Sequence, residues 1–179
     1  MGAHPCFTVG HSNRELGEFL ACLEAHGVTR LVDVRKLPGS ARYPWFDANR
    51  LSAALAERGI EMLRWDALTG RRPVSREVPF DVNAWWQNRS FHNYADHALS
   101  RGFADALSEL RRICASYRTA VMCSEAVWWR CHRRIIADHL LAAGEQVEHI
   151  LGPDRAEPAV LSAGAVVGRD GGVTYPASD

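Results

Sequence analysis

The chain alternates short apolar runs with segments whose apolar residues recur at helical spacing. Five of the runs are short enough for buried strands, namely residues 5–10, 29–34, 60–65, 119–123 and 146–150. Because helical segments separate them, they predict an α/β fold with an open, mostly parallel sheet, helices on both faces and right-handed crossovers. The expected architecture is a single three-layer domain with about five strands in the order 3-2-1-4-5.

Several helix ends carry recognisable signals. Ser12 and Glu15 have the spacing of a capping box, which predicts that the first helix begins at Ser12. Asp47 is the expected N-terminal cap of the second helix. Gly27 and Gly59 follow the first two helical segments, where a left-handed residue commonly ends a helix.

The last predicted helix follows the fourth strand. His132 lies one turn before the core-facing Ile136, so we expect it to point inward, with Arg133 flanking the same face. Arg134 and Asp138 are four residues apart. We expect them to form a solvated ion pair on the outer face of this helix.

Two segments depart from the alternating pattern. Residues 66–90 contain two prolines, a glycine and a cluster of arginines, and they predict a long, lid-like loop. Residues 152–179 are rich in glycine and proline, and the turn at Asp170-Gly171 predicts a small hairpin. The expected organisation is therefore one domain over residues 4–151, followed by a tail or hairpin over 152–179 that packs on it or extends from it.

Composition narrows the class of protein. Lys+Arg and Asp+Glu both number 21, so whole-molecule charge favours neither nucleic acid nor an acidic surface. Lys36 is the only lysine, and arginine suits bidentate contact with phosphate or carboxylate. The five cysteines lack a disulfide spacing, and no secretory signal or membrane span is visible. A cytoplasmic protein that is not associated with membranes is expected.

Chemically useful side chains gather where the predicted strands end. In open α/β sheets, ligands bind at the carboxyl ends of strands where the strand order reverses, here between strands one and four. We therefore expect a cleft in which Arg35 binds an anion and the backbone N–H groups after the first strand assist it. Two alternatives stay open: an Asp33–Arg35 structural ion pair and a purely capping role for Ser12. The residues at these ends are Gly10, His11, Ser12, Asn13, Asp33, Arg35, Cys123 and Glu125.

Four segments, TVGHSN, LVDVRKLPGSARYPWF, FHNYADH and VMCSEAVWWRCHRR, resemble the DUF488 family, a bacterial and archaeal family of unknown function. The similarity runs from about Phe7 to about Ile150. Its most specific part is the C-E-…-C-H-R arrangement after a strand. The resemblance implies a compact α/β domain with these motifs in one cleft, which adds Tyr94 and Cys131 to the candidate ligand-binding residues. It supplies no reaction. Arg133 is expected, from its position at the start of the last helix, to bind the anion together with Arg35.

Cys123, Glu125 and His132 are the candidates for chemistry. Cys123 is either an inert buried thiol or a thiolate favoured by a helix N-terminus and nearby arginines. A Cys-x5-Arg phosphatase loop is disfavoured, because Trp129 stands where the arginine would be. Glu125 and His132 would act as general acid, base or orienting groups. The spacing from Cys123 to Cys131 matches no familiar zinc pattern and no nucleotide fingerprint is present, so neither a metal nor a cofactor is expected.

Three functions remain open at this point. The main hypothesis is a protein that binds a small anionic, nucleotide-like ligand in the cleft, with hydrolytic or group-transfer chemistry. The second is a nucleic-acid-binding module that uses Arg71, Arg72, Arg76 and the neighbouring tryptophans. The third is a non-catalytic structural or partner-binding protein. The sequence predicts no oligomeric state.

Overall fold

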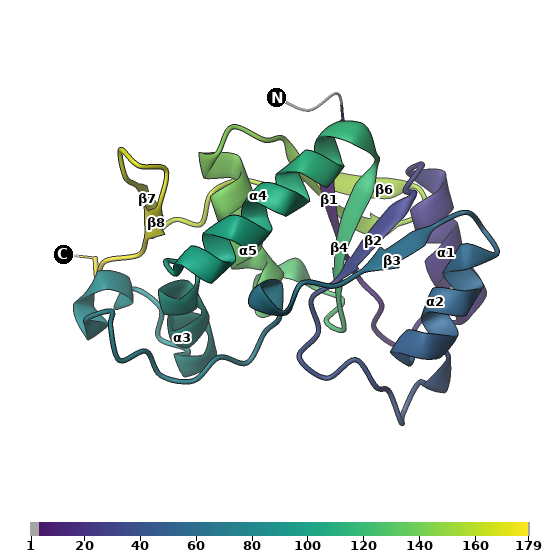
Figure 1. Ribbon diagram of the computed structural model, residues 1–179, viewed down its shortest axis with the longest axis horizontal. Helices are drawn as coiled ribbons and strands as arrows, with labels where there is room; N and C mark the ends of the chain where they lie inside the picture. Colours follow the sequence, from purple (N-terminus) through teal and green to yellow (C-terminus); the bar gives the residue numbers. More distant parts are fainter. Residues whose placement is uncertain (1–3, 179) are drawn as a thin grey trace.

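A computed structural model describes residues 4–178 and confirms the α/β architecture (Figure 1). A six-stranded sheet, parallel except for one edge strand, lies between two layers of helices. A separate two-stranded hairpin lies near the C-terminus, as predicted. Within residues 4–178, no helix has both the length and the apolar character needed to cross a membrane. The strands are β1 (Cys6–Gly10), β2 (Arg30–Asp33), β3 (Glu61–Leu63), β4 (Thr119–Cys123), β5 (Val147–Gly152), β6 (Arg155–Pro158), β7 (Val166–Val167) and β8 (Val173–Thr174).

The helices form the two outer layers. In Figure 1, α1 and α2 cover one face of the sheet, and α3, α4 and α5 lie on the other side. Short 3-10 turns mark the connections between these elements. The α-helices are α1 (Leu16–Ala25), α2 (Ala48–Ala56), α3 (Arg89–His97), α4 (Arg101–Ser116) and α5 (Arg133–Ala142). The 3-10 turns are η1 (Pro44–Phe46), η2 (Asp66–Leu68), η3 (Phe80–Asn83) and η4 (Trp128–Arg130).

The order of the strands is β3-β2-β4-β1-β5-β6, so the two central strands are exchanged relative to the expected order. β1 and β4 are parallel neighbours, as predicted, but β4 lies between β1 and β2. Both strands are five residues long and buried throughout, so their hydrophobic patterns fit either central position equally well. The exchange brings the end of β2 directly beside the end of β4. β6, an antiparallel edge strand, was not predicted.

Two hydrophobic cores fill the space between the layers. Successive residues of β4 alternate between them, because neighbouring side chains of a strand point to opposite faces. Ala120 and Met122 join the core under α1 and α2, whereas Val121 and Cys123 join the core under α3, α4 and α5. The alternation therefore directs the thiol of Cys123 to the face covered by α5.

The N-terminus of α1 differs from the prediction. The helix begins at Leu16 with Glu15 as its N-terminal cap, and no side chain caps it. Ser12 instead has φ 50, and its N–H donates to the carbonyl oxygen of Ser124 at 3.0 Å. The hydrogen-bond ladder between β1 and β4 thus extends past Gly10 and holds Ser12 outside the helix. The Asp47 cap is confirmed by its hydrogen bond from the N–H of Asn49.

Of the loop predicted over residues 66–90, residues 69–79 contain neither helix nor strand, but η2 and η3 lie within the predicted range and α3 begins in it at Arg89. The C-terminal segment contacts the residues that follow this loop, because the N–H of Trp85 donates to the carbonyl oxygen of Tyr175 at 2.9 Å. The Tyr175 hydroxyl donates to Asp138 on α5 at 2.7 Å. Asp138 is buried, and the Arg134 guanidinium donates to the Ser162 hydroxyl instead. The prediction of a solvated Arg134–Asp138 ion pair was therefore wrong.

Candidate functional site

A cleft lies at the carboxyl ends of β1, β2 and β4. Gly10 pairs with Cys123 and Asp33 pairs with Met122, so the strand register brings these three ends level. We call one part of the cleft the Cys123 pocket; its volume is about 360 Å³. The adjoining part, about 690 Å³, is the His11 pocket. The two share Arg35, Leu37, Ser124, Glu125 and Arg130.

The cleft gathers most of the residues predicted from the sequence. Gly10, Asp33 and Arg133 line neither pocket and instead lie behind the lining residues. The Cys123 pocket is lined by Arg35, Tyr94, Cys123, Glu125, Cys131 and His132, among others. The His11 pocket is lined by His11, Ser12, Asn13, Arg35 and Glu125, among others.

Cys123 and Cys131 form a pair of thiols in the Cys123 pocket. Both are buried; the Cys123 thiol donates to the Glu125 carbonyl oxygen at 3.8 Å, and the Cys131 Sγ lies 3.7 Å from His132 Nδ1. Burial raises the pKa of Cys123, but the Cys131 thiol and the Arg133 guanidinium together outweigh it and lower that pKa from 9.0. Burial and the contact with Cys123 raise the pKa of Cys131. The pair therefore has one thiol whose pKa is lowered and one whose pKa is raised.

Arg133 is a fully buried cation behind Cys123. One nitrogen, Nη2, donates to the carbonyl oxygen of Ala126 at 3.1 Å, while Nε and Nη1 have no partner in the described chain. No carboxylate of residues 4–178 forms an ion pair with it. A buried charge without a partner is costly. A thiolate at Cys123 would supply the missing negative charge.

His132 lies at the start of α5 and is neutral at neutral pH. Burial lowers its pKa to about 4, with smaller contributions from Arg133 and Arg72. Its ring packs against Gly70, where a Cβ would lie only 2.8 Å from the imidazole, and against the Tyr94 ring at 4.7 Å. The predicted inward direction of His132 is confirmed. Its Nε2 atom has no hydrogen-bond partner in the described residues.

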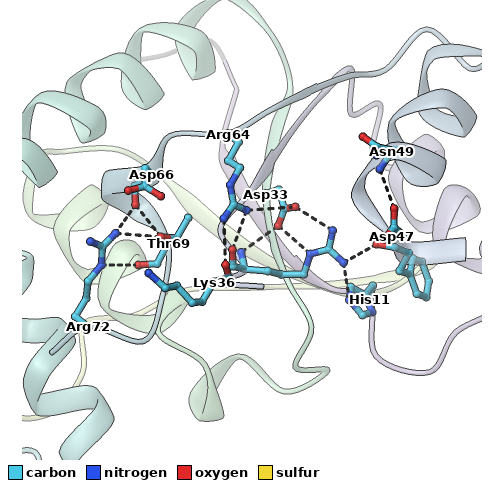
Figure 2. A network of polar contacts seen from close by, with 11 residues as sticks. His11, Asp33, Lys36, Asp47, Asn49, Arg64, Asp66, Thr69 and Arg72 are labelled. Atoms are coloured by element: carbon cyan, nitrogen blue, oxygen red, sulfur yellow. Dashed lines mark hydrogen bonds and ion pairs between the residues drawn. The ribbon is translucent and has the colours of Figure 1, made fainter. Parts of the chain in front are cut away.

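Asp33 and Arg35 form a structural ion pair, which the sequence had left open as an alternative to anion binding by Arg35. The Arg35 Nε and Nη2 atoms donate to the two oxygens of Asp33, each at 2.9 Å. Nη1 donates to Phe46 and to His11 Nε2, so four of the five N–H groups have partners within the described chain. Figure 2 shows Asp33 at the centre of this network, with Arg64 and His11 around it. Arg35 thus has one N–H left for a ligand.

His11 is held neutral in this network. Burial lowers its pKa to about 4, although the hydrogen bond to the backbone of Ser12 opposes the shift. Its Nδ1 lies 2.8 Å from the Ser12 carbonyl oxygen, and Nε2 accepts from Arg35 at 3.3 Å. The ring is stacked on Phe46 with centroids 4.2 Å apart. His11 therefore fixes the Arg35 guanidinium rather than carrying charge into the cleft.

Four further cations line the cleft and were not placed there from the sequence. Lys36, Arg42, Arg71 and Arg130 are exposed, and none forms an ion pair within residues 4–178. Glu125 is the only acidic side chain that lines either pocket. Lys36 directly follows Arg35 at a strand end, which is a signal that could have identified it. Arg130 could not be identified in this way, because it precedes α5 in a 3-10 turn that the periodicity does not predict.

Backbone strain coincides with the cleft. Ser12 and Arg71 are the two non-glycine residues with positive φ in the described part of the chain, at 50° and 56°. Ser12 lines the His11 pocket and Arg71 lines the Cys123 pocket. Such conformations cost about 1–3 kcal/mol each and tend to occur at functional sites.

Arg72 and the tryptophans of the nucleic-acid hypothesis have contacts within the protein. Arg72 donates to Thr69 and to the carbonyl oxygen of Asp66. Trp86 is stacked on Phe91 with centroids 5.0 Å apart, and Trp85 packs against Trp86. These contacts account for the positions of the tryptophans without a bound base. In the described part of the chain, no three His, Cys, Asp or Glu side chains are placed to hold a metal ion.

Fold and site together define an α/β protein with a mostly parallel sheet and a basic, thiol-containing cleft at the strand ends. A family model described as "Domain of unknown function DUF488" matches residues 15–140, so the chain belongs to the DUF488 family. The comparison with curated proteins and the comparison with solved structures each found no match.

Proposed function

We propose that the cleft binds a small anionic, nucleotide-like ligand and that Cys123 acts on it as a nucleophile in hydrolysis or group transfer. The observation that carries this proposal is the imbalance of charge at the cleft. Lys36, Arg71 and Arg130 surround it without carboxylate partners, and Glu125 is its only acidic lining residue. Cations gathered in a concave site favour an anion there.

The ligand's anionic group would contact the exposed cations Lys36, Arg71 and Arg130, with the remaining N–H of Arg35 beside them. Guanidinium groups suit phosphate or carboxylate, because their N–H groups match the spacing of two oxygens. A planar part of the ligand would lie near Phe91, which lines the Cys123 pocket and is supported by Trp86 behind it. This aromatic surface favours a nucleotide-like ligand over a simple inorganic anion.

The chemistry would begin at the Cys123 thiolate. Its sulphur would form a bond to the electrophilic phosphorus or carbon of the ligand while the bond to the leaving oxygen breaks, and that oxygen would take a proton from water. A second water, held by the Glu125 carboxylate, would then attack the intermediate and pass its proton to Glu125. The thiolate would leave unchanged. An acceptor hydroxyl in place of this water would give group transfer.

Calorimetric titration with inorganic phosphate and adenosine 5′-monophosphate tests the anion site. Arg130→Ala and Lys36→Ala should each weaken binding by about 1.5–3 kcal/mol, the range for a charged hydrogen bond. Arg112→Ala is the matched control, because Arg112 is exposed on α4 and contacts Glu109 there. Equal affinity in all four proteins, or binding that is absent from the wild type, would contradict the proposal.

A salt titration separates this proposal from the nucleic-acid hypothesis. A small anionic ligand that contacts one cluster of cations should lose affinity only modestly as salt rises. An oligonucleotide that neutralises many phosphates shows a steep logarithmic dependence. Tight, steeply salt-dependent oligonucleotide binding with no effect of Arg130→Ala would favour the second function.

A further inference from the structure

We infer that Cys123 and Cys131 are a redox-active pair, which a small hydroperoxide converts into an intramolecular disulfide. The inference deepens the proposed function, on which it rests, because it assigns a regulation to the same nucleophile. A disulfide would remove the Cys123 thiolate from the pocket, and reduction by a dithiol would restore it. The cleft would then be active only while this pair is reduced.

The positions of the two sulphurs support the inference. Both side chains line the Cys123 pocket, so a small oxidant can reach them although each residue is almost fully buried. Each thiol shifts the pKa of the other, as expected of neighbouring side chains. A disulfide requires the two Cβ atoms to lie about 3.5–4.5 Å apart.

The surroundings assign a different role to each thiol. Arg133 lies behind Cys123 and stabilises its thiolate, which makes Cys123 the attacking sulphur. Cys131 keeps its proton, and its Sγ accepts a hydrogen bond from the Arg133 N–H at 3.4 Å. That N–H would also stabilise the sulphur as it loses its proton. Cys131 is therefore the resolving thiol.

The disulfide forms in two steps. The Cys123 thiolate attacks one oxygen of the hydroperoxide, the O–O bond breaks, and Cys123 becomes a sulfenic acid while hydroxide or an alkoxide leaves. The Cys131 sulphur then attacks the sulfenic sulphur, and the S–O bond breaks. The departing hydroxyl takes the Cys131 proton and leaves as water. The peroxide is reduced by two electrons, and the two thiols are oxidised by two.

The molecule contains a matched control pair. Cys6 and Cys114 are a second pair of neighbouring thiols, and both are buried in one hydrophobic core. The contact with Cys114 and burial raise the pKa of Cys6, and neither cysteine lines any of the cleft pockets. These two thiols are neighbours but have no access for an oxidant from the cleft. Contact alone would predict oxidation of both pairs.

The test treats the reduced full-length chain with one equivalent of hydrogen peroxide at neutral pH, without any ligand. Peptide mapping by mass spectrometry then identifies the linked cysteines. We expect a Cys123–Cys131 peptide that dithiothreitol removes, and little or no Cys6–Cys114 peptide. In Cys131→Ser, the disulfide should be lost and Cys123 should accumulate as sulfenic or sulfinic acid. Cys22→Ser should behave like the wild type.

The result that overturns the inference is a wild-type protein without the Cys123–Cys131 peptide, or with equal linkage of the two pairs. The wild-type measurement decides the matter even if Cys131→Ser fails to fold. Phosphate binding by the reduced wild type is measured separately. A wild type that forms the disulfide but binds no phosphate would contradict the proposed ligand alone, whereas a wild type that binds phosphate but forms no disulfide would contradict the redox pair alone.

Discussion

Gly10 lies directly against the backbone of Glu125, and a Cβ at Gly10 would overlap the Glu125 carbonyl oxygen. The same Cβ would lie 2.9 Å from Nη1 of Arg133. The end of β1 thus has room for no side chain, because the segment after β4 folds over it. This close approach keeps Glu125 at the cleft and Arg133 beneath it, so a glycine at position 10 is a requirement of the site.

Gly10→Ala should therefore displace the segment after Cys123. We expect a loss of about 1–3 kcal/mol in the free energy of unfolding, the usual cost of overpacking, together with weaker anion binding. Gly17→Ala is the control, because position 17 is helical and nothing lies within 4 Å of its Cβ position. It should stabilise the protein by about 0.5–1 kcal/mol. Equal urea denaturation curves for the two variants would contradict the packing argument.

Much of the fold could be predicted from local patterns. The apolar runs located the five parallel strands, and the spacing of apolar residues placed His132 on the inner face of α5. The order of β1 and β4 could not be predicted, because both strands are apolar on both faces. The edge strand β6 has the sequence RAEP, which contains no apolar alternation. Its position depends on pairing with β5, a tertiary contact.

The location of the cleft was predicted, but its contacts were not. The ends of adjacent parallel strands must meet, so Cys123, Glu125 and Arg35 came together as expected. The partner of each arginine depends on the distance between segments far apart in the chain. Arg35 therefore turned out to be held by Asp33, His11 and Phe46. Arg133 turned out to be buried without a carboxylate, which no spacing along the chain could indicate.

The buried histidines predict the response of the protein to acid. Burial lowers the pKa of His132 and His139 to about 4 each, below the ordinary value of 6.5. Between pH 6.5 and 4 the unfolded chain binds protons that the folded chain does not, so stability should fall as the pH falls through this window. Each such histidine contributes up to about 1.4 kcal/mol per pH unit. Urea denaturation from pH 7 to pH 4.5 measures the slope.

His139→Leu isolates one of these histidines. Its Nε2 has no partner in the described chain, and its ring packs against Phe103 at 5.0 Å, away from the cleft. The variant should lose less stability than the wild type between pH 6.5 and 4.5, and phosphate binding should be unchanged. The same slope in both proteins would mean that His139 is protonated in the folded state.

The C-terminal segment should stabilise α5 through Asp138. Burial raises the pKa of Asp138, but hydrogen bonds from Ser162 and Tyr175 oppose that shift and satisfy both carboxylate oxygens. Tyr175→Phe removes one donor and leaves a buried acceptor oxygen without a partner. We expect a loss of about 1–3 kcal/mol in the free energy of unfolding. Tyr117→Phe on the exposed end of α4 is the control and should cost little. Equal thermal melts would show that the Asp138 oxygen finds another donor.

The pairing of Arg133 with Cys123 gives the most direct test of the chemistry. Arg133 lowers the pKa of Cys123 although burial raises it, so Arg133→Met should raise that pKa. The rate of alkylation by iodoacetamide at pH 7 should then fall, because the thiolate is the reacting species. Because the folded pKa of Cys123 lies below 9.0, wild-type stability should rise with pH from that pKa up to 9.0. In the variant this rise should disappear. Stability at pH 7 should be kept or increased, since methionine replaces a buried cation with two unpartnered nitrogens.

Arg134→Met is the matched control for this experiment. Arg134 is the next residue of α5, but its guanidinium donates to Ser162 and lies over the ring of Trp86 at 5.0 Å, outside the Cys123 environment. This variant should lose some stability and keep the wild-type rate of Cys123 alkylation, measured by peptide mass spectrometry against Cys22 in the same sample. Burial raises the pKa of Cys22, so it is a slow internal reference. If Cys123 and Cys22 react equally slowly in the wild type, or if Arg133→Met leaves the rate at Cys123 unchanged, Cys123 is an inert core thiol and another group must balance the charge of Arg133.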